Sequence, residues 1–146
     1  MSKFIQALLV GIFFTFILDF FIFLGIKENY IDFYEIDLYY NILFADNQNI
    51  YIFFTLSIIL GLIITYANKI ISLIIVILLF VLSLLTLSQD IGYKLGESML
   101  MSKKITLKNN RHTFYGDVYY SGRKNIIFYD YELKKIILIT KKELIR

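Results

Sequence analysis

Residues 50–87 decide the fold. They read IYIFFTLSIILGLIITYANKIISLIIVILLFVLSLLTL and contain two apolar runs of 18 residues, 50–67 and 70–87, which are separated by Asn68 and Lys69. As a single helix this stretch would be about 57 Å long, nearly twice the roughly 30 Å hydrocarbon core of a bilayer. The polar pair at its midpoint therefore predicts a tight hairpin of two transmembrane helices, at about 50–67 and 70–88.

A third apolar run precedes the hairpin, at residues 4–26. It has 23 residues and one charged side chain, Asp19. A helix of about 20 apolar residues spans the bilayer core, whereas the apolar part of a signal peptide has only about 7–15. Lys27 and Glu28 follow the run, and they do not fit a cleavage site of small residues. We therefore predict an α-helical integral membrane protein with three transmembrane helices, in which 27–49 is an acidic, aromatic loop.

The composition agrees with a membrane protein and excludes several kinds of chemistry. The chain is 58% hydrophobic, against about 45–50% in soluble proteins. It has no Cys and a single His, His112, so a disulfide framework and a multi-histidine metal site are excluded within one chain. No phosphate-binding loop or nucleophile motif occurs. We expect no enzyme activity, cofactor or metal. The abundance of Ile, Phe, Tyr, Lys and Asn is typical of an AT-rich bacterial genome.

The pattern changes after residue 88. Residues 89–101 have helical spacing and predict an amphipathic helix that extends the third span. From 102 to 146, apolar residues alternate with polar ones, as at 126 and 128 or at 136 and 138, and turn-like segments separate the runs. This alternation predicts three or four antiparallel strands. We expect a transmembrane region, 1–88, followed by a small C-terminal β domain, 89–146.

The C-terminal domain is basic. Residues 1–87 have three basic and six acidic side chains, a net charge of −3, whereas residues 88–146 have twelve and six, a net charge of +6. The basic surface consists mainly of pairs: Lys103, Lys104, Arg123, Lys124, Lys134, Lys135, Lys141 and Lys142. They are either solubilising flanks of the strands or contacts to anionic headgroups or an acidic partner. Four tyrosines lie among them, but no nucleic-acid-binding motif does, so we do not expect nucleic-acid binding.

Small and polar residues form stripes at a spacing of four on all three apolar helices. They are Ala7, Gly11 and Thr15, continued by Asp19, on the first; Ser57, Gly61 and Thr65 on the second; and Ser88, Gly92 and Gly96 at the end of the third. Such stripes let helix backbones approach closely. They indicate either packing within one bundle or self-association, and the sequence does not choose between them.

Asp19 is the one ionisable residue well inside an apolar run. Such residues are expensive in a membrane and are often functional. Residues at matching depth on the other helices are hydroxyls near Ser57 and Thr86, with no cation among them. Asp19 is either a protonated structural acid or part of an ion or proton pathway.

Together these features predict a non-enzymatic, self-associating membrane subunit, whose basic domain binds or regulates a partner protein at the membrane surface. The alternative is a small oligomeric channel or membrane-perturbing effector, as in bacterial immunity or phage defence, with Asp19 facing the pore. The multi-pass protein is placed in the cell (inner) membrane with its C-terminal domain cytoplasmic, since that side then carries most of the positive charge. Residues 102–146 are too few to fold well alone, and their strands are apolar on both faces, so one face requires a partner.

Overall fold

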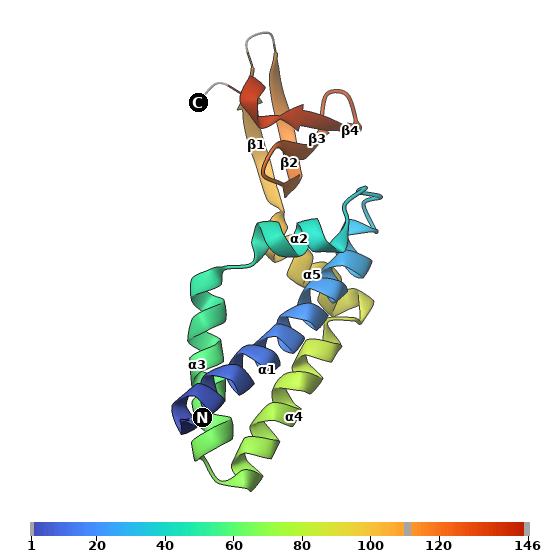
Figure 1. Ribbon diagram of the computed structural model, residues 1–146. Helices are drawn as coiled ribbons and strands as arrows, with labels where there is room; N and C mark the ends of the chain where they lie inside the picture. The colour runs from blue at the N-terminus through green and yellow to red at the C-terminus, as the bar shows by residue number, and fades with distance from the viewer. Residues whose placement is uncertain (1, 110–111, 145–146) are drawn as a thin grey trace.

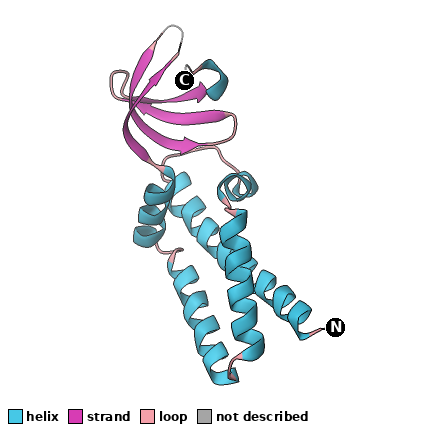
Figure 2. Ribbon diagram, turned by 90° about the vertical axis from the view of Figure 1, so that its left-hand side faces the viewer, coloured by secondary structure: helices cyan, strands magenta, loops and turns pink. Residues whose placement is uncertain are grey.

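The structure is a computed structural model that describes residues 2–109 and 112–144. Within them, five α-helices precede a four-stranded antiparallel sheet, which lies at one end of the helices (Figures 1 and 2). This confirms a helical region followed by a small β domain. The elements are α1 Lys3–Ile26, α2 Tyr40–Asn47, α3 Ile50–Tyr66, α4 Lys69–Leu85, α5 Gln89–Leu100, β1 Ser102–Lys108, β2 Thr113–Ser121, β3 Asn125–Asp130 and β4 Lys135–Thr140.

One helix is long and apolar enough by itself to cross a membrane. It combines α1 with a π-helical turn, Lys27–Ile31, and so runs from Lys3 to Ile31. The pairs α2–α3 and α4–α5 meet the same criterion only when each pair is taken as one broken span, which would give up to three spans. Length and composition thus identify one spanning helix.

The predicted break between the two apolar runs is present, but neither helix beside it meets the criterion for a span by itself. Helices α3 and α4 have 17 residues each and are separated at Ala67 and Asn68. The side chain of Asn68 begins α4, because its Oδ1 accepts a hydrogen bond from the Ile70 N–H at 3.0 Å. The Ser72 hydroxyl donates to the Ile63 carbonyl at 2.8 Å and ties the two helices together near the turn.

The expectation that residues 89–101 extend the third span is wrong. Helix α5 turns by 86° from α4. The Thr86 hydroxyl donates to the Phe21 carbonyl at 3.0 Å, and the Asn29 side-chain amide donates to the carbonyls of Thr86 and Leu87. Asn29, in the π-helical turn after α1, therefore satisfies the carbonyls just beyond the end of α4. At this point the chain turns and begins α5. Helix α2, within the segment 27–49 that was predicted to be a loop, likewise lies at 86° to α3.

The strands pair in the order β1-β2-β3-β4 with short connections. The sheet curls, and a bridge between Asn109 and Leu144 joins the chain beyond β1 to the chain beyond β4. The inner face is thereby enclosed around Phe128, whose side chain is fully buried, together with Val118, Ile126 and Ile139. The sheet thus covers this face by its own curvature.

Candidate functional site

The outer face of the sheet carries a row of tyrosines. Tyr119 stacks on Tyr129, with ring centroids 5.9 Å apart, and Tyr129 contacts Tyr131, which in turn contacts Tyr115. The alternation of β2 and β3 places these residues on the face opposite Phe128. The sequence showed the four tyrosines only as scattered aromatics, and strand pairing brings them together. We call Tyr115, Tyr119, Tyr129 and Tyr131 the tyrosine row.

Asp117 fixes the tyrosine row to the neighbouring strand. Its Oδ1 accepts hydrogen bonds from the Tyr131 hydroxyl at 2.7 Å and from the Lys104 backbone N–H at 2.8 Å. Lys104 has φ 55°, at an irregularity in the pairing of β1 with β2. The hydrogen bond to Asp117 raises the pKa of Tyr131 to about 12, because the carboxylate disfavours a second negative charge. The hydroxyl therefore stays protonated and keeps donating at neutral pH.

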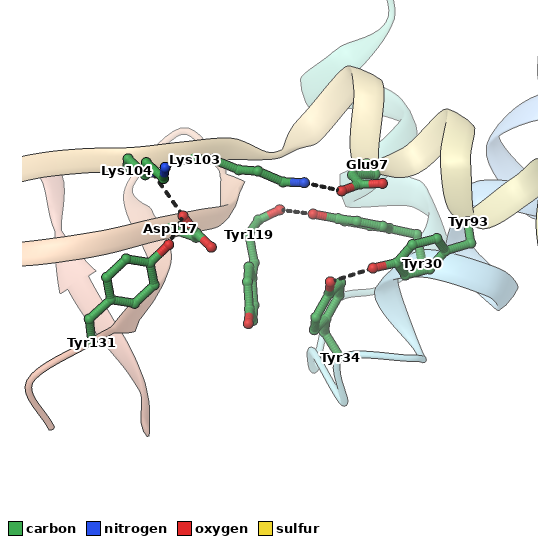
Figure 3. Close-up of polar contacts among 9 residues, drawn as sticks. All are labelled: Tyr30, Tyr34, Tyr93, Glu97, Lys103, Lys104, Asp117, Tyr119 and Tyr131. Atoms are coloured by element: carbon green, nitrogen blue, oxygen red, sulfur yellow. Dashed lines mark hydrogen bonds and ion pairs between the residues drawn. The ribbon is translucent and has the colours of Figure 1, made fainter. Parts of the chain in front are cut away.

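The end of the row nearest the helices is held by residues from them (Figure 3). The Tyr30 hydroxyl donates to the Tyr119 carbonyl at 2.9 Å, and the Tyr34 ring lies 4.0 Å from the Tyr119 ring. The hydroxyls of Tyr34 and Tyr93 share a hydrogen bond of 2.6 Å. Burial, followed by this bond, raises the pKa of Tyr34 well above its ordinary value. The tyrosines of the loop and of α5 thus continue the row from the sheet into the helical region.

A second contact between helices and sheet centres on Asp46, at the end of α2. Its carboxylate accepts a hydrogen bond from the Tyr120 hydroxyl at 3.0 Å and forms an ion pair with Arg123 Nε at 2.6 Å. Arg123 also donates to the Ala45 carbonyl at 2.9 Å. The side chain of Asp46 is only 8% exposed. Because a buried carboxylate is costly without partners, these bonds fix the sheet in one position on α2.

An apolar core fills the space between these two polar contacts. It includes Ile26, Tyr30, Ile31 and Leu43, which are fully buried, and Tyr120 from the sheet. We use the word junction for this core together with the contacts of Tyr30 and Asp46. The junction holds the sheet against α1, α2 and α5, so that the direction of its outer face is set by the helices.

Two hollows lie beside the junction, where the sheet meets the loop and α2. One, of about 310 Å³, lies between loop residues 34–37 and the side chains of Ile127, Ile136 and Leu138. The other, of about 530 Å³, lies between α2 and the β2–β3 turn and includes Arg123 and Lys124. Ile136 and Leu138 on β4 are 45% and 66% exposed, so the outer face remains open next to the loop and α2.

The stripes of α1 and α3 meet each other. A Cβ added to Gly11 would overlap the Ser57 carbonyl oxygen, and one added to Gly61 would overlap the Ala7 carbonyl oxygen. Thr15 is also buried, and its hydroxyl has no hydrogen-bond partner in the described part of the chain. The third stripe packs elsewhere, since Gly92 lies against Gly25 and Thr86, and Gly96 against the Tyr30 ring. Ser88, at the start of the third stripe, is exposed. Thr65, at the end of the second stripe, is half-buried.

Asp19 lies near the start of α3 rather than opposite its middle. It is half-buried, and its Oδ2 accepts a hydrogen bond from the Gln48 side-chain amide at 3.0 Å. The sequence predicted hydroxyls near Asp19 but gave no sign of Gln48, because the bend between α2 and α3 was not expected. Asp19 also lines a cavity of about 400 Å³ among α1, α3 and α4, together with Ser83 and Thr86.

The basic side chains separate into two groups. Lys103 pairs with Glu97 of α5 and Arg123 with Asp46, so both contribute to the contact between sheet and helices. The others are exposed, and none forms an ion pair within the described residues: Lys104, Lys124, Lys134, Lys135, Lys141 and Lys142. No group of acidic and histidine side chains that could hold a metal ion was found in the same part of the chain.

Comparisons with protein-family models, with curated proteins and with solved structures each gave no match. The class of protein therefore follows from the structure alone. The chain is a helical protein with one helix able to cross a membrane, and it holds a small antiparallel sheet against that helix's end.

Proposed function

We propose that the chain is a membrane-anchored docking subunit, which holds the outer face of its sheet at the membrane surface to bind a partner protein. The observation that carries this proposal is the outer face itself. It presents tyrosines and two exposed aliphatic side chains, Ile136 and Leu138, while the junction fixes its position. Tyrosine is enriched in protein interfaces, and an apolar patch rimmed by charge is typical of a binding surface.

In this proposal three spans form the anchor. Helices α3 and α4 have 17 residues each, the lower end of what crosses a bilayer core. Their surfaces away from α1 are almost entirely apolar and exposed, for example Ile58, Leu62, Ile74 and Leu78. Such surfaces suit lipid and not water. Helices α2 and α5, at 86° to the spans, would then lie along the membrane surface.

The sheet would lie on the cytoplasmic side of the cell membrane. An odd number of spans places the two termini on opposite sides, and the side with the sheet then carries Lys27 and twelve further basic residues. The excess of Lys and Arg favours the cytoplasm. A reporter enzyme fused after Arg146 should be active only inside the cell. Activity restricted to the outside would reverse the orientation.

The structure removes one argument for self-association. The stripes on α1 and α3 pack against each other within one chain and are not available to a second copy. We therefore leave oligomerisation out of the proposed function. A mass measurement on the purified protein in detergent decides it independently.

Photo-cross-linking in intact cells tests the proposal. A photoreactive amino acid replaces Leu138 on the outer face, and in a matched variant it replaces Thr106, an exposed residue of β1. The proposal expects a discrete adduct with a second protein from position 138 and none from position 106. Adducts with lipid alone, or equal labelling at both positions, would contradict it.

A further inference from the structure

We propose that the free edge of β4 binds an extended segment of the partner protein by strand addition, and that this segment has acidic residues at both ends. The inference rests on the proposed function and names the chemistry of the partner. Strand β4 is the last strand of the sheet and pairs only with β3 (Figure 1). Its other edge therefore offers backbone groups to a further strand.

The hydrogen-bonding pattern shows which backbone groups are offered. The Lys141 N–H donates to the Lys124 carbonyl at 2.9 Å, just beyond the last pair of β3 and β4, Asn125 and Thr140. Hydrogen-bonded and non-hydrogen-bonded pairs alternate in an antiparallel ladder. The N–H and C=O groups of residues 137 and 139 thus point toward β3. Those of 136, 138 and 140 point to the free edge, where no backbone partner occurs within the described residues.

The side chains at these positions suit a docked strand. Ile136 and Leu138 point to the outer face and are exposed, and they line the hollow of about 310 Å³. Strand addition draws affinity from main-chain bonds and specificity from pockets for alternate side chains. The hollow provides one such pocket beside the middle of β4.

The charges along this edge indicate which kind of segment binds there. Exposed lysines lie at both ends of β4, with Lys134 and Lys135 at its start and Lys141 and Lys142 just after its end. A second copy pairing antiparallel with β4 would bring one lysine pair beside the other, and such like-charge neighbours are destabilising. An extended segment with acidic ends would pair with all four. Its centre should be uncharged, because Glu35 and Asp37 line the opposite wall of the hollow.

The test uses the full chain in nanodiscs of zwitterionic lipid, which keeps anionic headgroups from competing for the lysines. The probe is a short synthetic peptide with an alternating Val-Thr centre and two glutamates at each end. We expect it to bind at least about tenfold more tightly than the same peptide with lysines at its ends. Binding should also slow amide hydrogen exchange at residues 136, 138 and 140 relative to their neighbours.

Four variants separate strand addition from other binding. Leu138→Pro removes an outward N–H and no bond to β3, so it should abolish peptide binding. Leu138→Thr keeps the N–H and should retain most of it. The paired change Lys134→Gln and Lys135→Gln should weaken binding, while Lys104→Gln and Lys108→Gln, the same change of charge at exposed residues of β1, should not.

The outcomes keep this inference apart from the proposed function. Unchanged amide exchange on β4 with normal cross-linking from position 138 would overturn strand addition and leave docking on the outer face. The lysines would then serve only to protect an edge strand from aggregation. Tight binding of the lysine-ended peptide, or β4–β4 pairing between two copies, would overturn the charge assignment. Loss of all cross-linking from position 138 would remove both proposals.

Discussion

The contact between α1 and α3 and the junction between the helices and the sheet hold the same chain together by opposite means. Between the helices, the contact depends on the lack of a side chain at Gly11 and Gly61, which lets the two backbones touch. At the junction, it depends on polar atoms in defined positions, such as the hydroxyls of Tyr30 and Tyr120 and the carboxylate of Asp46.

The difference follows from the solvent each contact excludes. In an apolar environment, burial of apolar side chains against each other gains little over contact with lipid, so close packing of small residues stabilises helix pairs. At the junction, water competes for every polar group, and burial together with satisfied hydrogen bonds favours the docked state. Adding a side chain should therefore disrupt the α1–α3 contact, whereas removing a polar group should disrupt the junction.

The largest effect is expected from Gly11→Leu. The added side chain would meet the backbone of α3, which cannot move aside as a flexible side chain can. Overpacking commonly costs about 1–3 kcal/mol, and we expect the upper end or more here. Thermal unfolding in detergent measures it. Phe13→Leu, at an exposed position of the same helix, is the control and should be neutral. Equal stability of both variants would contradict the α1–α3 packing.

The junction should lose about 2 kcal/mol in Asp46→Ala, because Tyr120 and Arg123 both lose their partner, and hydrogen bonds to charged groups contribute about 1.5–3 kcal/mol. Amide exchange should accelerate at the end of α2 and in the β2–β3 turn, while α3 and α4 stay protected. Arg123→Lys keeps the charge and should have a smaller effect. Uniform destabilisation of the whole chain would show that the junction does not open separately.

Raising the pH should also weaken the junction. Burial, and then the hydrogen bond to Asp46, raises the pKa of Tyr120 to about 12 from the ordinary value near 10. A raised pKa in the folded state stabilises the fold below pH 10, and this contribution is lost as the pH rises through 12. Amide exchange at the junction, corrected for its intrinsic pH dependence, should increase over this interval. The increase should be smaller in Tyr120→Phe, which cannot ionise.

Tyr30→Phe removes one hydroxyl and keeps the buried ring. The Tyr119 carbonyl loses its donor from the helices, and a neutral hydrogen bond contributes about 1 kcal/mol. Denaturant unfolding monitored by near-ultraviolet circular dichroism measures this loss. A change well above 2 kcal/mol would indicate that the ring moves as well.

The smallest effect is expected from Asp19→Asn. The Asn oxygen can still accept the hydrogen bond from Gln48, so folding and stability should change by less than about 0.5 kcal/mol. Thermal unfolding checks this expectation. If Asp19 lies on an ion or proton pathway, conductance in planar bilayers should change while stability does not. A strong loss of assembly would contradict a neutral structural role.

The sequence predicted features that depend on neighbours along the chain. Asn68 and Lys69 located the break between α3 and α4, and alternation after residue 101 predicted the strands. It did not predict the turn between α4 and α5, because the bond that closes this turn joins Asn29 to Thr86, 57 residues away. Asp46 was missed for the same reason, since its partner Tyr120 is 74 residues distant. The residues next to Asp46 in the sequence do not indicate that it contacts the sheet.

Docking depends most on the claim that the junction fixes the sheet on the helices. The most direct test is the distance between nitroxide labels on Asn41→Cys in α2 and Glu132→Cys beyond β3, measured by pulsed electron resonance in nanodiscs. The chain has no other cysteine to label. We predict one narrow distance distribution, which broadens in Asp46→Ala. A broad distribution in the unaltered chain would show that the sheet moves freely on a flexible connection, and would contradict the claim.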